Sequence, residues 1–365
     1  MLRRRIMHIN RRDAARLRLS PYLRLAERII RGPGSLASVA TECELLCPEE
    51  ITENRPTVFL ENQLERLTAG TEHRPLADEI ESMLAPTYTH AATIAYHVKN
   101  AAVLDGSVYS RNLRHFVADK IEGNRDAAVP HLKTAGLASS AIGHRYFGHW
   151  LRDDCLQYLL ARETGAVVSF TTPAWTHKSQ YAALFGQTWT PIDRAIVDDL
   201  IIYQDFGQNS LKAKRYGILS QLIKSRHPSS GPRDKLVYLR RGETGVARTI
   251  FEEERLLELL ARNDFELLDI ATHNLDFIIK TLLRAKLVVS MEGSQIAHCC
   301  YTLDPGCGLL IMEPSDRFTA VHRHWSSRIG IQTGFVVGTA SPTGYRFSGE
   351  EVLRTSDLMI SRQHV

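Results

Sequence analysis

Three arginines follow an apolar run of the chain in a pattern that suits an anion. Arg240 and Arg241 come directly after the run Lys235–Leu239, and Arg248 stands seven residues after Arg241. Guanidinium groups bind phosphate oxygens through paired hydrogen bonds, and open α/β sheets bind ligands at the carboxyl ends of their strands. We therefore predict that these arginines hold the phosphates of a nucleotide, with either Arg240 or Arg241 pointing inward. The alternative is a solvated loop in which they pair with the acidic residues 252–254.

A second polar group stands between an apolar run and a segment of helical pattern. It reads Glu292-Gly293-Ser294-Gln295 and is followed by His298. The first turn of a helix attracts anions through its unpaired N–H groups, and a glycine lets the ligand approach. A carboxylate repels a diphosphate, so Glu292 is expected to accept hydrogen bonds from ribose or sugar hydroxyls. For His298 a role in the site and a role as a buried structural histidine are left equally open.

Glu313 ends the apolar run that follows Pro305-Gly306. It is expected either to bind ribose or donor hydroxyls, as acidic residues at strand ends do in nucleotide-binding sheets, or to lie on the surface. Four aromatic side chains could stack on sugar rings, although such residues more often belong to a core: Trp150, Trp175, Trp189 and Tyr203.

His149 and Asp153 are four residues apart, which places them on one face of a helix. An imidazole beside a carboxylate can serve as a general base, or the carboxylate can orient the imidazole. The alternative is a histidine and an aspartate that pair only to stabilise the start of the helix. From the spacing alone the structural alternative is preferred.

The elements that must position these residues alternate between short β-rich runs and helical patterns, which is typical of βαβ units on a parallel sheet. Strands are expected at residues 57–61, 92–98, 101–104, 108–110, 166–170, 199–205, 235–239, 265–270, 286–291, 308–312 and 334–337. Helices are expected at residues 148–164, 211–225, 251–262, 275–284 and 349–357, the last capped by Ser348. The breaker cluster at 226–233 is interpreted as a linker. The predicted division is a basic N-terminal extension (1–55), an acceptor-side α/β domain (56–230) and a nucleotide-sugar-side α/β domain with a tail (231–365).

These blocks together resemble glycosyltransferase family 61, in its bacterial capsular polysaccharide type, over roughly residues 141–316. The resemblance rests on Leu239-Arg240-Arg241 with Arg248 and Glu252 downstream, on the block 292–298 followed by Pro-Gly, and on the aromatic segment Tyr146–Leu160. It implies a GT-B-like α/β fold, in which two Rossmann-like domains face a cleft, and transfer with inversion. It also reverses the preference at His149 and Asp153 in favour of catalysis. Two positions depart from the pattern, because Glu292 stands where a histidine is usual and His298 where an asparagine is usual.

Composition narrows the class of protein further. The 365 residues are 44% apolar and 24% charged, with a net charge of +4, which is ordinary for a globular protein and too mild to indicate nucleic acid binding. No apolar run approaches the ~18 residues of a membrane span. The arginine-rich start is interpreted as a leader packed on the body through Leu17, Leu23 and Ile30, with a helix on an anionic membrane as the alternative, and Pro21 is expected to interrupt any long helix. The six cysteines show no metal-binding or disulfide spacing and are expected to be reduced.

The sequence thus predicts a glycosyltransferase that moves a sugar from a nucleotide-sugar donor to a saccharide acceptor in polysaccharide biosynthesis. His149 and Asp153 are the expected catalytic residues. No metal or cofactor is expected, because no Asp-x-Asp triplet ends an apolar strand. The expected location is cytoplasmic, at the inner face of the membrane if the N-terminal segment binds there. The alternatives are another polysaccharide-modifying transferase, such as a pyruvyl or phosphoryl transferase, and a non-catalytic saccharide-binding protein.

Overall fold

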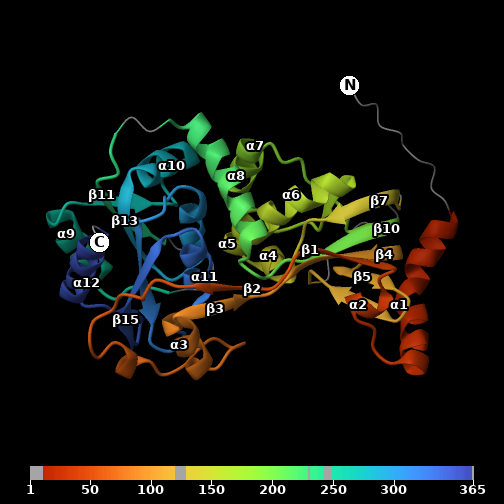
Figure 1. The fold of residues 1–365 in the computed structure, drawn as a ribbon, viewed down its shortest axis with the longest axis horizontal. Coiled ribbons are helices and arrows are strands. Elements are labelled where there is room, and N and C mark those ends of the chain that lie inside the picture. The colour runs from red at the N-terminus through yellow and green to blue at the C-terminus, as the bar shows by residue number, and fades with distance from the viewer. Residues whose placement is uncertain (1–10, 120–128, 229–230, 242–247, 364–365) are drawn as a thin grey trace. The chain divides into compact units, whose positions relative to one another are not determined.

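The protein is a mixed α/β structure of two compact units (Figure 1), here a computed structural model that describes residues 11–119, 129–228, 231–241 and 248–363. Unit 1 comprises residues 1–49 and 91–207, and unit 2 comprises residues 50–90 and 208–365. Both units are therefore assembled from two stretches of chain. These boundaries differ from the predicted ones, because residues 11–49 pack within unit 1 and residues 50–90 within unit 2.

Unit 1 is built on one eight-stranded sheet in the order β6-β5-β4-β10-β7-β8-β9, with β1 also paired to β4. Strand β10 runs parallel to β7, and β7, β8 and β9 are parallel, whereas β1, β4, β5 and β6 pair antiparallel. The strands are β1 (Glu42–Cys47), β4 (Thr93–Leu104), β5 (Ser107–Ser110), β6 (Leu113–Phe116), β7 (His131–Leu137), β8 (Ala166–Ser169), β9 (Thr190–Pro191) and β10 (Arg194–Gln204).

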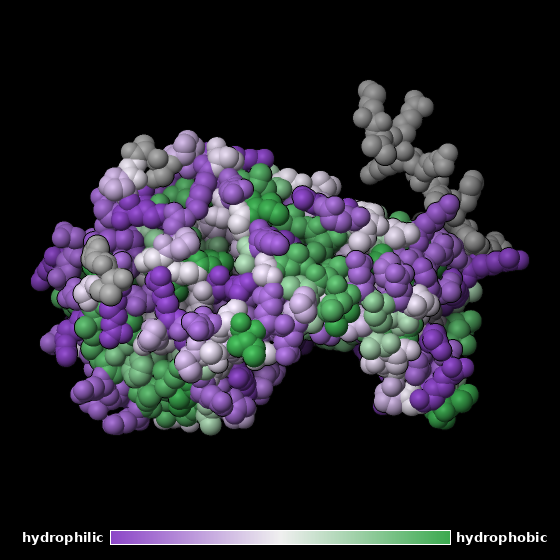
Figure 2. Space-filling view, viewed as in Figure 1, coloured by the Kyte–Doolittle hydropathy of each residue, from purple (hydrophilic) through white to green (hydrophobic). Residues whose placement is uncertain are grey.

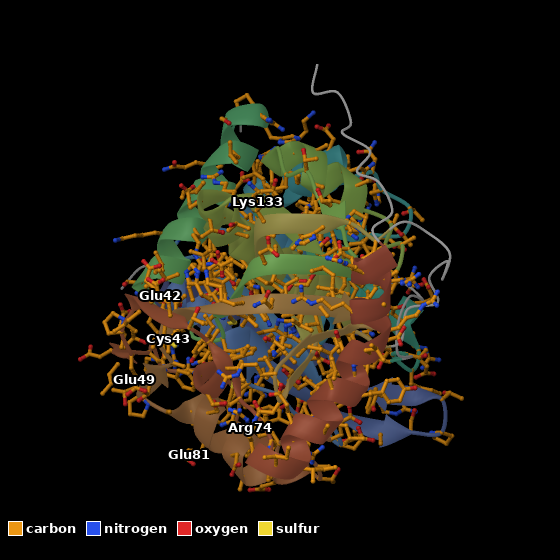
Figure 3. All side chains as sticks on the ribbon, turned by 90° about the vertical axis from the view of Figure 1, so that its right-hand side faces the viewer. Glu42, Cys43, Glu49, Arg74, Glu81 and Lys133 are labelled. Atoms are coloured by element: carbon orange, nitrogen blue, oxygen red, sulfur yellow. The ribbon has the colours of Figure 1, made fainter. Side chains whose placement is uncertain are left out.

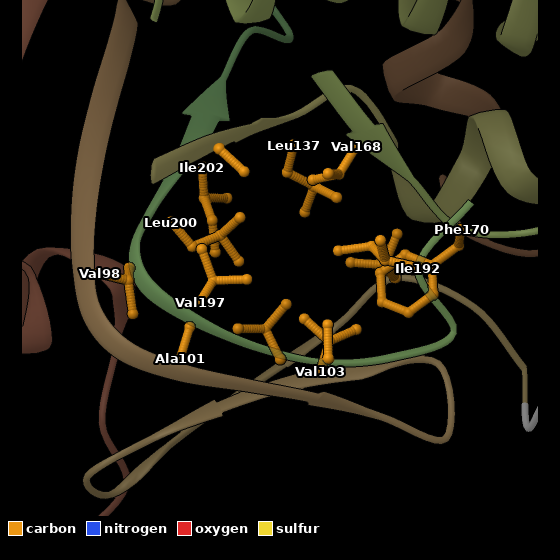
Figure 4. Packing of buried hydrophobic residues seen from close by; sticks show 14 of the residues in the cluster. Val98, Ala101, Val103, Leu137, Val168, Phe170, Ile192, Val197, Leu200 and Ile202 are labelled. Carbon is orange, nitrogen blue, oxygen red and sulfur yellow. The ribbon is translucent and has the colours of Figure 1, made fainter. Parts of the chain in front are cut away.

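The core of unit 1 lies on the central strands of this sheet. Val98 and Val103 of β4, Val197 and Leu200 of β10 and Leu137 of β7 are all shielded from solvent, and Figure 4 shows their side chains converging. The helices of the unit are α1 (Arg11–Arg31), α2 (Leu36–Val39), α4 (Ala141–Arg145), α5 (Phe147–His149), the π-helical turn η2 (Trp150–Asp154), α6 (Cys155–Thr164) and α7 (Lys178–Phe185). Burial of β-branched side chains on a pleated surface thus holds the unit together.

Helix α1 corrects two expectations. It continues without a break across Pro21, and only one of its three expected anchors is buried. Leu17 is inaccessible and packs with residues of β4, β5 and β10, whereas Leu23 and Ile30 are 58% and 81% exposed. Figure 3 views unit 1 from the side on which α1 lies.

Unit 2 contains a six-stranded sheet in the order β12-β11-β13-β14-β15-β16. The first five strands are parallel, and only β16 is antiparallel. They are β11 (Lys235–Arg240), β12 (Phe265–Asp269), β13 (Ala285–Met291), β14 (Gly308–Pro314), β15 (Gln332–Ser341) and β16 (Gly344–Arg346), and a separate pair is formed by β2 (Glu50–Glu53) and β3 (Thr87–His90). Three consecutive residues of β13 are inaccessible to solvent, namely Leu287, Val288 and Val289, as expected for a parallel strand covered on both faces.

The helices of unit 2 connect these strands. They are η1 (Leu64–Arg66), α3 (Leu76–Leu84), α8 (Ser210–Arg226), α9 (Glu253–Arg262), α10 (Leu275–Leu283), the 3₁₀ helix η3 (Ser294–Tyr301), α11 (Val321–Arg328) and α12 (Gly349–Arg362). Side-chain caps start several of them, and Ser348 accepts a hydrogen bond from the Glu351 amide as predicted for α12.

Most expected elements of residues 142–357 are present, and the differences are local. Residues 57–61 form no strand, since Val58 makes only an isolated bridge to Gly334. The two strands expected on either side of Lys99-Asn100 are one strand, β4, while the turn at Asp105-Gly106 is confirmed. Strands β1, β2, β3, β6, β7, β9 and β16 were not expected.

Candidate functional site

The strand order of unit 2 by itself indicates where a ligand would bind. With β11 as the first parallel strand, the order β12-β11-β13-β14-β15 is the 2-1-3-4-5 arrangement. After β12 is added on one side of β11, the remaining parallel strands are added on the other side, beginning with β13. In doubly wound sheets ligands bind at such a switch point, outside the carboxyl ends of the strands. Arg241 follows β11 directly, and Glu292-Gly293 follows β13. The residues predicted from the sequence therefore lie at this point.

Arg241, not Arg240, points across the switch point. Its Nη1 donates a 2.6 Å hydrogen bond to the carbonyl oxygen of Glu292. Gly293 makes this approach feasible, because a Cβ at that position would lie 2.0 Å from the same Nη1. Burial, followed by the charge of Arg248, lowers the pKa of Arg241 to about 10, so the guanidinium is charged at neutral pH.

Arg248 contacts the same carbonyl oxygen. Its Nη1 donates to the Glu292 carbonyl at 3.0 Å and forms an ion pair with the Glu292 carboxylate. Both side chains are only 8% exposed. The Nε of Arg248 is buried and makes no hydrogen bond to any described residue. The loop between the two arginines, residues 242–247, lies outside the described residues.

Glu292 is the centre of a buried charge cluster. Arg317 Nη1 lies 3.2 Å from Glu292 Oε2, and His322 Nε2 lies 3.6 Å from Oε1. Trp325 donates its indole N–H to His322 Nδ1 at 3.3 Å, so Nε2 carries the ring proton that faces Glu292. Burial alone would raise the pKa of Glu292, but the contact with His322 and the charges of Arg248 and Arg317 outweigh burial and lower it.

The charges of this cluster do not cancel. Arg241, Arg248 and Arg317 carry three positive charges, against one negative charge on Glu292. The repulsion that Glu292 was expected to exert on a diphosphate is therefore offset by its own partners. The cluster as a whole attracts an anion.

Glu313 lies at the end of β14 and is fully buried. Within the described residues, neither of its carboxyl oxygens makes a hydrogen bond of good geometry. Burial, followed by the charge of Glu292, raises the pKa of Glu313 well above its usual range. A protonated carboxyl can donate one hydrogen bond and accept others, and buried polar groups without partners in a native structure commonly mark the place of a ligand or water. Glu313 is thus suited to bind a hydroxyl.

Two of the predicted residues make their contacts elsewhere. Arg240 donates to Glu253 from Nε at 3.1 Å and from Nη2 at 2.8 Å. Glu252 pairs with Arg255 at 2.9 Å and Arg346 at 3.2 Å. The contacts of Arg240 match the alternative in which the arginines pair with residues 252–254, whereas Glu252 pairs with two arginines outside that set.

The remaining residues of the second block have mainly structural contacts. Gln295 donates to Ser290 Oγ at 3.0 Å and to the Met291 carbonyl, which ties η3 to β13. His298 is inaccessible within η3, and Ser294, the first residue of η3, is partly buried. The expected α-helix at this point is a 3₁₀ helix.

In unit 1, His149 and Asp153 form the predicted pair. His149 Nδ1 lies 2.8 Å from Asp153 Oδ2, and both side chains retain 17–18% of their exposure. Arg152 contacts both, with Nη2 at 3.1 Å from Asp153 Oδ2 and 2.6 Å from His149 Nδ1. One nitrogen cannot donate to the carboxylate and accept from arginine together, so the tautomer decides which contact is a hydrogen bond. Arg152 and Asp153 lie on the π-helical turn η2, which His149 precedes, and such turns are frequent at functional sites.

The neighbouring residues of η2 are structural. Asp154 is inaccessible and accepts hydrogen bonds from the backbone N–H of Ser140 at 3.1 Å and from its hydroxyl at 2.7 Å. Trp150 is 1% exposed and lies against Trp175 and Trp189, with ring centroids 6.3 and 5.7 Å away. Trp150 therefore belongs to a core, as the sequence analysis favoured.

Sequence reasoning missed Arg317 and His322 and gave Arg152 no role. Arg317 lies four residues beyond Glu313, so its position after a strand end was a usable signal. His322 lies on α11, which was not predicted. Among the described residues, no group of three or more His, Cys, Asp or Glu could hold a metal ion.

Part of this chain is similar to a known protein family. No curated protein matches this chain. Residues 147–310 match the family model Glycosyltransferase 61, a span that includes η2, β11 and the switch point of unit 2. This part of the chain is thus similar to glycosyltransferase family 61, which supports the assignment of the protein as a glycosyltransferase enzyme.

Proposed function

We propose that this glycosyltransferase uses a nucleotide sugar as its donor and binds the nucleotide at the switch point of unit 2. The observation that carries the proposal is the convergence of Arg241 and Arg248 on the Glu292 carbonyl, with Arg317 beside them. Three guanidinium groups around one carboxylate leave net positive charge where a diphosphate would bind. The buried Nε of Arg248 supplies a donor that no described residue uses.

Glu313 is proposed to bind a hydroxyl of the ribose or of the donor sugar. Its carboxyl is buried, burial and the charge of Glu292 raise its pKa, and neither oxygen makes a good hydrogen bond in the described part of the chain. A bound hydroxyl would accept a hydrogen bond from the carboxyl O–H and donate one to the second carboxyl oxygen. Such a contact would orient the donor without adding negative charge beside the phosphates.

Asp153 and His149 are proposed to activate the acceptor. The acceptor hydroxyl would attack the anomeric carbon as the bond to the diphosphate breaks, and the hydroxyl proton would pass to Asp153. General base catalysis of this kind typically contributes about 10²–10⁴-fold in rate. One in-line displacement inverts the anomeric configuration. In this proposal unit 2 binds the donor and unit 1 supplies the base, and the GT-B arrangement stays a prediction from the resemblance.

We also propose that the reaction is independent of metal ions, because the arginines supply the positive charge that the leaving diphosphate needs. The expected acceptor is a saccharide of a growing bacterial polysaccharide, and the expected location is cytoplasmic; both remain predictions from the sequence.

A panel of nucleotide sugars tests the proposal. Each is scored for thermal stabilisation of the protein and for nucleotide release, with and without a chelator and with saccharide acceptors. A donor that stabilises the protein and is consumed only with an acceptor supports the proposal. Stabilisation without turnover would indicate a saccharide-binding protein, and no response to any nucleotide or nucleotide sugar would contradict the donor site. Turnover abolished by the chelator would contradict metal independence.

A further inference from the structure

Helix α1 has an apolar face that the fold does not cover. Among the described residues, six of the seventeen large hydrophobic side chains that are exposed belong to this one helix. They are Leu19, Tyr22, Leu23, Leu25, Ile29 and Ile30, with exposures from 50% to 81%. Leu19, Tyr22, Leu23, Ile29 and Ile30 recur with helical spacing and form one outward stripe.

The opposite face holds the helix on unit 1. Leu17 is inaccessible and packs with Ala102, Tyr109 and Ile196. Asp13 is buried and lies 3.1 Å from His131 Nδ1. The exposed apolar residues of α1 are therefore not needed to anchor the helix on unit 1.

Helix α1 is strongly basic, and its spacing puts Arg12, Arg16 and Arg18 on or beside the stripe. Arginines occur along the whole helix: Arg12, Arg16, Arg18, Arg24, Arg28 and Arg31. The acidic residues of α1 are Asp13, which is buried against His131, and Glu27. In Figure 2 hydrophobic and hydrophilic side chains alternate along the outer edge of this helix.

We propose that α1 docks unit 1 on an anionic lipid bilayer, with the stripe in the headgroup region and the arginines on lipid phosphates. Amphipathic helices with large apolar side chains and a basic border lie in the plane of such surfaces. A second copy of the chain fits less well, because self-association would bring two rows of arginines together. No described helix is long and apolar enough to cross a bilayer, so α1 would lie on the membrane.

The test is flotation of the full chain with vesicles of phosphatidylcholine alone and with vesicles that also contain about 30% of the anionic lipid phosphatidylglycerol. Both kinds of vesicle are used at low and at high salt. We expect binding only to the anionic vesicles, and weaker binding at high salt. Replacing Arg18, which borders the stripe, by Gln should weaken binding about fivefold, the equivalent of ~1 kcal/mol for one arginine. The double change Leu23→Glu with Ile30→Glu should abolish it.

The matched control is Ile51→Glu. Ile51 lies on β2 and is 73% exposed, so this variant places the same charge on an equally exposed apolar residue away from α1 and should bind as the native chain does. Circular dichroism checks that each variant is folded. No binding to anionic vesicles, or equal binding by the double variant, would overturn the proposal. A native dimer that the double variant converts to a monomer, without vesicle binding, would show instead that the stripe joins two copies.

Discussion

Replacement of Arg248 by Met separates the two roles of this arginine. The change keeps an unbranched apolar stem and removes the charged guanidinium group. Arg248 and Glu292 form an ion pair at 8% exposure, and loss of one partner of a buried pair typically costs about 3–5 kcal/mol. Arg317 and His322 remain beside Glu292 at 3.2 and 3.6 Å, so we expect the lower end, about 3 kcal/mol of unfolding free energy.

Nucleotide affinity should fall as well, for a separate reason. A hydrogen bond from a charged donor contributes about 1.5–3 kcal/mol, which corresponds to a loss of about 10- to 150-fold. Urea denaturation measures the first effect, and calorimetric titration of the folded variant with a nucleotide diphosphate measures the second.

Two further variants show which role is at work. Combining Arg248→Met with Glu292→Gln removes the unpaired charge, so stability should partly recover while nucleotide affinity stays low. Arg240→Met is the matched control, because Arg240 ends β11 but pairs with Glu253. It should cost under ~1 kcal/mol and leave affinity unchanged. Recovery of affinity in the double variant, or a larger loss in Arg240→Met, would refute the assignment of Arg248 to the phosphate site.

The remaining predictions concern the base, the glycine and the buried acid. Asp153→Asn should abolish transfer while donor binding survives, whereas Asp154→Asn should lower the melting temperature and leave turnover per folded molecule nearly intact; near-native turnover by Asp153→Asn would exclude it as the base. Gly293→Ala should weaken nucleotide binding, because its Cβ would lie 2.0 Å from Arg241 Nη1, and unchanged affinity would show that Arg241 is not needed in this position. Glu313 has a raised pKa in the folded protein, so folding favours its protonated form, and its contribution to stability is present below its unfolded pKa of about 4.5 and is lost as pH rises above it. The native chain should therefore lose unfolding free energy relative to Glu313→Gln as the pH rises from about 4, near the ordinary pKa of a glutamate, to about 7. A difference between the two proteins that stays constant with pH would contradict the raised pKa.

Local signals predicted the elements that position the site. The alternation of apolar runs and helical patterns from Lys235 onward identified β11, β12, β13, β14, α9 and α10 close to their observed bounds. Strands buried on both faces must be apolar throughout, so they are readable from sequence. Strands β1, β2 and β7 were not predicted, because each contains exposed and half-buried residues and owes its conformation to partners distant in the chain.

The amino-acid sequence by itself determined the βαβ pattern, the polar residues that follow β11, β13 and β14, and the His149–Asp153 spacing, because each depends on residues near one another in the chain. Only the tertiary structure decided between Arg240 and Arg241, since that choice depends on which partner, Glu253 or the Glu292 carbonyl, lies within reach. The tertiary structure also brings Arg317 and His322 close to Glu292 and leaves the apolar stripe of α1 exposed. Contacts between segments far apart in sequence depend on strand order and packing, and neither is encoded in the local pattern of side chains.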